Sequence, residues 1–252
     1  MDSIQLRALQ MMEFEMLLEV DRICNKHNLR YYLIGGTALG AVRYGGFIPW
    51  DDDIDVAMPR HDYEQFLKIC SQELPENYCL QTFKSQPHFP LPFAKVTRDD
   101  TTFIEASLQK LKIHHGIFVD VFPLDGVPRS VVLRAVQAVL LKIAAHIPIG
   151  VSKRLTFFRC FSIDWIISRA SLDKSESWAN RFGGPREIMD RNVWGNPKLI
   201  EFEGHPFPVP QRCDAYLANL YGNYMEPPPV EQRNGHSPLV VDLHRSYVEY
   251  FR

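Results

Sequence analysis

The segment GGTALGAVRYGGFIPWDDDIDVAM, residues 35–58, places a glycine pair and a cluster of acids in one short stretch of the chain. Its last part, DIDVAM, alternates acidic and apolar residues before it becomes fully apolar, which predicts a β-strand. On a strand, Asp53 and Asp55 point to the same face. Two neighbouring carboxylates repel each other, and a divalent cation between them removes that cost. Hard oxygen ligands favour Mg²⁺, with Mn²⁺ as the alternative ion; a solvated acidic turn without metal is the other interpretation.

The glycine pair has the pattern of a phosphate-binding turn. Gly35 and Gly36 follow the apolar run 29–34, which predicts a strand, and a helix is expected to begin at Thr37. A glycine turn that leads into a helix presents N–H groups and a positive potential to an anion. The Thr37 hydroxyl adds a donor. An ordinary tight turn is the alternative, but the spacing allows this loop to return beside the acids.

A third acid lies in the run IFVDVF, residues 117–122, where large apolar residues surround Asp120. This pattern predicts a buried strand, and a buried carboxylate requires a partner or a metal. We expect Asp120 to complete a triad with Asp53 and Asp55, either as a base for an attacking hydroxyl or as a metal ligand. A structural role, in which Asp120 caps a neighbouring turn, is equally open from this pattern alone.

The composition excludes several classes of protein. With 252 residues, of which 46% are hydrophobic and 23% charged, the chain is globular and long enough for one or two domains. The formal net charge is −2, so we expect no nucleic acid partner. Five scattered cysteines predict neither a disulfide framework nor a zinc cluster. The start of the chain lacks an export signal, and we therefore expect a cytoplasmic protein.

The order of the predicted elements indicates an α+β fold. A helix capped by Ser3 is expected to run to about Lys26, and another over residues 60–74. Strands are expected at residues 29–34, 53–58, 78–83, 93–97 and 117–122. Residues 1–125 therefore predict a mixed β-sheet core flanked by helices.

Residues 126–252 are expected to form a mainly helical remainder that packs on this core. Proline-rich joints at 206–210 and 227–229 divide it. We expect a single domain over residues 1–252.

Residues 127–170 are the most basic part of the chain. They hold seven Lys and Arg residues against one acid, Asp164, and large apolar side chains alternate with these charges. The stretch 131–151 has the length of a membrane span, but charged residues interrupt it, so no span is expected. Two interpretations remain: helices that pack on the core with solvated basic faces, which we favour, or a peripheral surface that contacts anionic lipid at the inner face of a membrane.

The run IGGTALGAVRYGGFIPWDDDIDVAMPR, residues 34–60, resembles the LicD family of phosphotransferases. This family lies in the nucleotidyltransferase-fold superfamily, with fukutin and fukutin-related protein as distant relatives. Further agreeing stretches are FAKV at 93–96, DTTF at 100–103, VDVFPLD at 119–125, YL at 216–217 and LYG at 220–222 before the prolines at 227–228. The resemblance covers most of the chain and is weakest over about 127–200, and it implies a nucleotidyltransferase-like fold.

The resemblance also implies roles for particular residues. The implied catalytic acids, which also bind the metal, are Asp53, Asp55 and Asp120. The implied substrate-binding residues are Gly35, Gly36, Thr37, Arg43, Lys95, Arg233 and His236. Lys95 would neutralise a diphosphate unless it is a surface lysine on an edge strand. Arg43 would do the same unless it pairs with the neighbouring acids Asp51 or Asp52.

The activity implied by the resemblance is transfer of a phospho-alcohol, such as phosphocholine, from a CDP-linked donor such as CDP-choline. The acceptor would be a hydroxyl of a cell-surface glycan or its lipid-linked oligosaccharide precursor, as in lipopolysaccharide or teichoic acid synthesis. Three other classes remain open: a nucleotidyltransferase that attaches NMP to a small molecule or protein, a D-x-D glycosyltransferase, and a non-catalytic nucleotide- or carbohydrate-binding protein.

Overall fold

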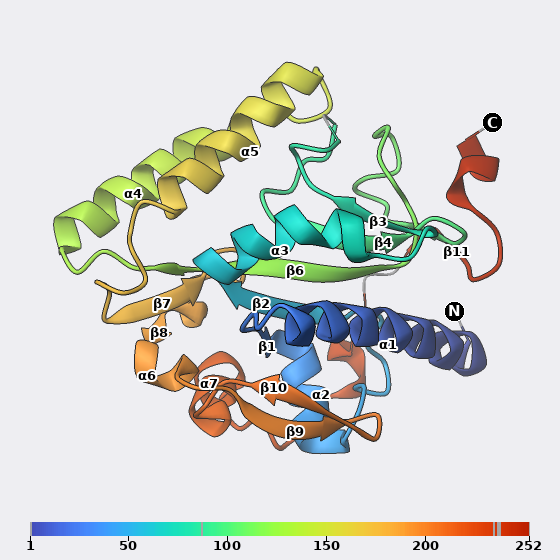
Figure 1. Ribbon diagram of the computed structural model, residues 1–252, viewed down its shortest axis with the longest axis horizontal. Coiled ribbons are helices and arrows are strands. Elements are labelled where there is room, and N and C mark those ends of the chain that lie inside the picture. Colours follow the sequence, from blue (N-terminus) through green and yellow to red (C-terminus); the bar gives the residue numbers. More distant parts are fainter. Residues whose placement is uncertain (1, 87, 234, 236–237, 252) are drawn as a thin grey trace.

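A mixed β-sheet forms the centre of the molecule (Figure 1). The structure is a computed structural model, and it describes residues 2–86, 88–233, 235 and 238–251. The strands of this sheet are β1 (Tyr32–Leu33), β2 (Asp55–Pro59), β3 (Tyr78–Gln81), β4 (Ala94–Arg98), β6 (Phe118–Gly126), β7 (Ser177–Asn180) and β8 (Met189–Asp190). The order is β1-β2-β6-β4-β3, and β7 pairs with the end of β6 and with β8. β2 and β6 run parallel, and the other neighbours are antiparallel. The expected mixed sheet flanked by helices is confirmed.

Helices and small strand pairs surround this sheet. The α-helices are α1 (Ser3–Lys26), α2 (Gly35–Tyr44), α3 (Arg60–Glu73), α4 (Val131–Ala145), α5 (Lys153–Ile167), α6 (Arg191–Trp194) and α7 (Cys213–Tyr221). The separate antiparallel pairs are β9 (Lys198–Phe202) with β10 (His205–Val209), and β5 (Thr102–Ile104) with β11 (Val240–Asp242). Short 3₁₀ helices are η1 (Pro185–Glu187), η2 (Val230–Gln232) and η3 (Tyr247–Phe251).

β6, in the middle of the sheet, is buried along its whole length. α1 and α3 lie side by side against the sheet, and the Lys26 ammonium of α1 meets the Glu73 carboxylate at the end of α3 at 2.7 Å. α1 spans the predicted residues, but Asp2 rather than Ser3 is its N-cap. The Asp2 carboxylate accepts a hydrogen bond from the Gln5 N–H at 2.8 Å, which satisfies a donor of the first turn.

The C-terminal half is not mainly helical, which corrects the expectation for residues 126–252. Strands β7 to β11 lie in this half together with helices α4 to α7. The proline-rich stretch 206–210 is mostly β10 instead of a joint. Pro206 and Pro208 alternate along β10, so both missing N–H groups face away from its partner β9. A strand that is paired along one edge only tolerates prolines on its other edge. The sequence pattern alone predicts a break at such prolines.

A buried ion cluster attaches the hairpin of α4 and α5 to the rest of the molecule. The Arg60 guanidinium, at the start of α3, donates two hydrogen bonds to Asp125 of β6, at 2.8 and 2.6 Å. Its third bond reaches Asp164 of α5 at 2.8 Å. Arg60 and Asp125 are both shielded from solvent, so the three charges depend on one another. Within the described residues, none of the helices combines the length and the hydrophobicity needed to cross a bilayer.

Candidate active site

Three charged side chains form a row across the middle of the sheet. Asp55 on β2 lies in register with Asp120 on β6, and Asp120 lies in register with Lys95 on β4. Residues that pair across neighbouring strands point to the same face of a sheet, so these side chains share one face. The Lys95 ammonium lies 3.3 Å from Asp120 Oδ1 and 3.3 Å from Glu105 Oε2. Lys95 is therefore a buried charge partner on an inner strand, not a surface lysine on an edge strand.

Burial and mutual repulsion raise the pKa of both aspartates. Burial raises the pKa of Asp120 to about 6, with Lys95 opposing the shift and Asp53 adding to it. Burial also raises the pKa of Asp55, and the charges of Asp53 and Asp120 add to the effect. Carboxylates that cannot ionise freely together favour a shared proton or a cation between them. The row therefore has the chemistry of a divalent metal site.

Asp53 does not lie on the strand, which corrects the expected alternation with Asp55. β2 begins at Asp55, and the residues before it form an irregular segment. The carbonyl of Ile54 still accepts a hydrogen bond from the Asp120 N–H at 2.9 Å, so the last residue of this segment is bonded to β6. The charge of Asp53 acts on both Asp55 and Asp120, and so Asp53 remains part of the same acidic site.

A second acidic group, Asp51 to Asp53, precedes the row. One carboxylate oxygen from each of these three residues lies within 4.8 Å of the others, a spacing compatible with a metal ion. Glu13 of α1 is fully buried beside them, and neither of its carboxyl oxygens has a hydrogen-bond partner in the described part of the chain. Burial, followed by the charges of Asp53 and Asp52, raises the pKa of Glu13 well above its usual range. Acidic side chains from α1, the segment 51–53, β2 and β6 thus act on one another in one acidic site.

The two glycines allow the start of α2 to approach these acids closely. Gly35 has a φ of 54°, in the left-handed region, and a Cβ there would lie 3.1 Å from Asp55 Oδ2. A Cβ on Gly36 would lie 2.6 Å from Asp51 Oδ2. The Thr37 hydroxyl accepts a hydrogen bond from the Asp55 N–H at 2.8 Å, so it fixes the start of β2 instead of standing open to substrate. The residue that precedes α2 makes no side-chain cap, which leaves N–H groups of the first turn for an anion.

Two further predicted substrate-binding residues, Arg43 and Arg233, lie among the described residues. Arg43 donates to a backbone carbonyl at 3.3 Å and forms no ion pair with its expected acidic partners within the described chain. The Arg233 guanidinium stacks over Trp50, with its carbon 4.4 Å from the ring centroid. Arg233 therefore lies against the start of the acidic segment. His236 lies outside the described residues.

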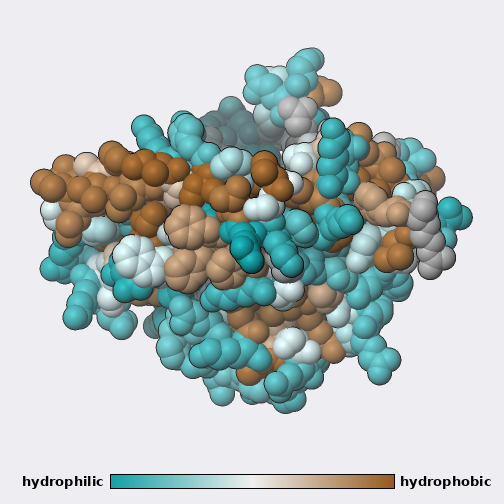
Figure 2. All heavy atoms as spheres, turned by 90° about the horizontal axis from the view of Figure 1, so that it is seen from above, coloured by the Kyte–Doolittle hydropathy of each residue, from teal (hydrophilic) through white to brown (hydrophobic). Residues whose placement is uncertain are grey.

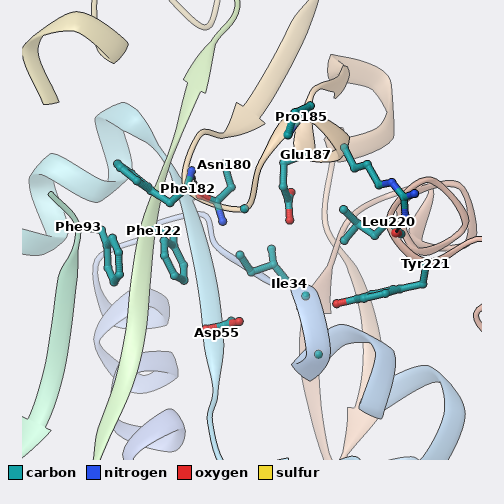
Figure 3. A pocket seen from close by; sticks show the side chains of 14 residues that line it. Ile34, Asp55, Phe93, Phe122, Asn180, Phe182, Pro185, Glu187, Leu220 and Tyr221 are labelled. Atoms are coloured by element: carbon teal, nitrogen blue, oxygen red, sulfur yellow. Dashed lines mark hydrogen bonds between the residues drawn. The ribbon is translucent and has the colours of Figure 1, made fainter. Parts of the chain in front are cut away.

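A pocket of about 590 Å³ opens beside the glycine pair and Asp55 (Figure 3). Phe93, Phe122 and Phe182 form an aromatic wall on one side, with ring centroids 4.4, 5.4 and 6.3 Å apart. The end of α7 lines the opposite side, where the Tyr221 hydroxyl points towards the glycine loop. The pocket thus joins an acidic end, beside the glycine pair, to an aromatic end.

A buried carboxyl group faces this pocket. Glu187 is 4% exposed; its Oε1 accepts a hydrogen bond from the Tyr216 hydroxyl at 3.3 Å, and its Oε2 has no partner among the described residues. The same Tyr216 hydroxyl accepts from the Gly35 N–H at 3.0 Å, which connects Glu187 with the glycine loop. Burial raises the pKa of Glu187 to about 7. In Figure 3 its carboxyl group points into the space between the aromatic wall and α7.

Glu13 and Glu187 lie outside the site predicted from the sequence. Glu13 carries a detectable signal, because it interrupts the apolar stripe of α1 midway between Leu9 and Leu17, four residues from each. Glu187 carries none, since it ends a short 3₁₀ turn without periodicity. Tyr216 lies in a stretch that resembles the LicD family, but only the folded chain shows which groups it joins.

The part of the chain that carries the charged row matches a known protein family. Residues 28–132 match the family described as LicD/FKTN/FKRP, nucleotidyltransferase domain. Residues 28–132 therefore belong to this family. The matched span contains the glycine pair, the acidic segment, Lys95 and Asp120, so the whole row lies within the family domain. The predicted LicD resemblance, and with it the expectation of a LicD-type transferase, is confirmed.

Beyond this domain, the chain is similar over most of its length to a curated relative. The lipopolysaccharide cholinephosphotransferase LicD of Haemophilus influenzae is 29% identical over 94% of this chain and 97% of that protein. An uncharacterized protein of Rickettsia typhi is 36% identical over 23% of this chain and 19% of its own length. Another of Rickettsia prowazekii is 32% identical over 27% of this chain and 30% of its own length. The similarity to the Haemophilus protein extends through the C-terminal half, which supplies Glu187 and α7.

Proposed function

We propose that this LicD-family enzyme transfers phosphocholine from CDP-choline to a hydroxyl group of a lipopolysaccharide sugar. The observation that carries the proposal is the row of Asp55, Asp120 and Lys95 beside a pocket entered by the N-terminus of α2. Choline phosphate and lipopolysaccharide are named for the Haemophilus relative, and the family resemblance supports a CDP-linked donor. A row of acids next to a phosphate-binding turn suits phosphoryl transfer, which depends on positioning and charge neutralisation.

We assign Mg²⁺ to Asp53, Asp55 and Asp120; Asp53 also belongs to the group Asp51 to Asp53, whose oxygens lie within 4.8 Å of one another. The donor set consists of hard oxygen ligands. Asp120 Oδ1 is buried, with the Lys95 ammonium at 3.3 Å but no well-aligned hydrogen bond within the described chain. This oxygen is therefore suited to a further ligand. When bound, the ion neutralises charge on the diphosphate and on the leaving group.

The protein's own groups act on the two ends of the reaction. The N–H groups of Gly36 and Thr37, in the first turn of α2, bind non-bridging oxygens of the diphosphate. Asp120 accepts the proton of the acceptor hydroxyl. The oxygen of that hydroxyl attacks the phosphorus that carries choline. The bond from this phosphorus to the bridging oxygen breaks, and CMP leaves with the electron pair.

The aromatic end of the pocket supports a cationic alcohol on the donor. Quaternary ammonium groups bind against the faces of aromatic rings. A buried carboxylate adds a counter-charge, and Glu187 offers an oxygen that no described group occupies. A trimethylammonium group cannot donate a hydrogen bond, so it does not require the full set of polar partners that a buried ammonium needs. Choline therefore suits this end of the pocket better than a neutral polyol.

A transfer assay with the purified protein tests the function. With CDP-choline, Mg²⁺ and lipopolysaccharide that lacks phosphocholine, we expect CMP and sugar-linked phosphocholine in equal amounts, measured by chromatography and ³¹P NMR. Chelation of Mg²⁺ should abolish both products. Release of pyrophosphate from CTP, with CMP attached to the acceptor, would assign a nucleotidyltransferase instead. Binding of CDP-choline without turnover would identify a binding protein.

Glu187→Gln is expected to reduce the preference for CDP-choline over CDP-glycerol by about tenfold in kcat/KM, because one buried charge contact is lost. The preference of the unmutated enzyme should increase from pH 6 to pH 8. Its Glu187 has a pKa raised to about 7 by burial, so the carboxyl loses its proton and gains its charge in this range. In the variant, the ratio of kcat/KM values should not change with pH. The ratio of the two kcat/KM values cancels effects common to both donors. An unchanged preference in the variant would therefore mean that Glu187 does not contact the choline group.

A further inference from the structure

α4 presents its apolar stripe to solvent. Val132, Val136, Val139 and Ile143 recur at the spacing of one helix face, and each is exposed, from 49% for Val136 to 70% for Val132. The buried residues of α4, Gln137 and Ala144, lie on another face, where α4 contacts α5. The interpretation in which the apolar face packs on the core therefore does not hold for this helix.

α5 adds aromatic residues to the same hairpin. Phe158, Phe161 and Trp165 follow one another along one face and are 58%, 44% and 48% exposed. The side of α5 that packs inwards is different, formed by Thr156, Cys160, Ile163 and Ile167. Figure 2 shows the result as a band of hydrophobic side chains over the part of the surface that the hairpin forms. A soluble monomer rarely exposes so continuous an apolar surface without a partner.

A groove of about 650 Å³ lies where the two helices meet the body of the protein. Leu133, Val136, Leu140 and Trp165 give it apolar walls. Arg129, Arg169 and Lys174 also line the groove. Arg129 pairs with Glu176 at 3.1 Å and Arg169 stacks on Trp165 at 4.4 Å, whereas Lys174 forms no ion pair within the described chain. The groove thus combines an apolar interior with basic residues.

The charges of the hairpin are unbalanced at its surface. Residues 127–170 carry seven basic residues and the single acid Asp164. Arg60, which lies outside this segment, holds Asp164 at 2.8 Å, so this acid does not neutralise the basic residues around it. Lys142, Lys153 and Arg154 form no ion pair in the described part of the chain, and all three are exposed.

We propose that the α4–α5 hairpin is a docking surface for a bilayer that contains anionic phospholipid. The apolar stripes and the aromatic residues enter the headgroup region, and the basic residues meet lipid phosphates. A second copy of the chain fits this surface poorly, because contact between two such hairpins would bring two basic surfaces together. The proposal does not depend on the transferase reaction, although a lipid-anchored acceptor would be presented at such a surface.

Vesicle cosedimentation tests the docking surface with the full chain. We expect binding to vesicles of phosphatidylcholine and phosphatidylglycerol at 70:30 and at least tenfold weaker binding to phosphatidylcholine alone. Lys153→Gln with Arg154→Gln should weaken binding to the anionic vesicles about thirtyfold, and Val136→Glu with Phe158→Glu at least tenfold. The matched controls are Leu199→Glu, which replaces an apolar residue that is 70% exposed on β9, and Arg212→Gln on the surface before α7; both should bind normally.

The unfolding temperatures of these variants, measured by circular dichroism, should equal that of the unmutated protein, because every substituted side chain is exposed. Asp55→Asn should bind vesicles normally, which separates docking from catalysis. Absence of binding to the anionic vesicles, or equal binding of the hairpin variants and the controls, would overturn the proposal. Dimerisation that the Val136→Glu and Phe158→Glu pair abolishes, measured by sedimentation without vesicles, would assign the surface to a second copy instead.

Discussion

Asp55→Asn and Asp120→Asn each lower kcat by about 10³-fold or more with CDP-choline and Mg²⁺, because each removes a charge on which metal binding and proton transfer depend. Stability should not fall in parallel. The folded protein holds both carboxyls with pKa values raised by burial, so their ionisation opposes folding above the ordinary pKa of aspartate. Replacing either with an uncharged side chain of the same shape should leave the unfolding temperature at pH 8 unchanged or higher. The measurements are steady-state kinetics and thermal unfolding.

Asp173→Asn is the matched control, since Asp173 is exposed and lies on a loop outside the pocket. It should retain normal kcat and normal stability. Turnover within tenfold of the unmutated enzyme in both row variants would refute the assignment of the row. A large fall in unfolding temperature together with the loss of activity would instead give these aspartates a structural role.

Arg60→Gln is expected to lower the free energy of unfolding by about 3–5 kcal/mol, the largest stability effect that we predict. Arg60 makes two hydrogen bonds to Asp125 and one to Asp164. Asp125 is almost fully buried, so its charge would remain without a partner when the guanidinium is removed. Urea unfolding at pH 7 measures the change, and the loss should shrink as the pH falls and Asp125 takes up a proton.

Arg22→Gln serves as the comparison for this variant. Arg22 bridges Glu19 and Glu73 at the surface, where an ion pair contributes at most about 1 kcal/mol. Similar losses in Arg60→Gln and Arg22→Gln would mean that the buried cluster does not hold the hairpin to the core. A double variant, Arg60→Gln with Asp125→Asn, should recover part of the stability lost by Arg60→Gln, because it removes the uncompensated charge.

Local pattern was sufficient for the elements that carry the site. The apolar run around Asp120 predicts a buried strand, and β6 is that strand. The helix expected from Thr37 begins two residues earlier, as α2 at Gly35, so the glycine pair lies in its first turn. These signals are strong because each depends on neighbouring residues only, through side-chain alternation and the freedom of glycine at positive φ. The role of Thr37 could not follow from them, since its hydrogen-bond partner depends on where β2 begins.

Only the tertiary structure decided how these elements combine. It placed Lys95 between Asp120 and Glu105, brought Glu187 to the pocket from a turn in the other half of the chain, and made β10 from a stretch that its prolines mark as a joint. The physical reason is that strand register and burial depend on which distant segments pair, and the energy of that pairing is spread over the whole core. The sequence by itself therefore determined the chemical groups and the local elements of the site, and the packing of those elements determined which groups meet.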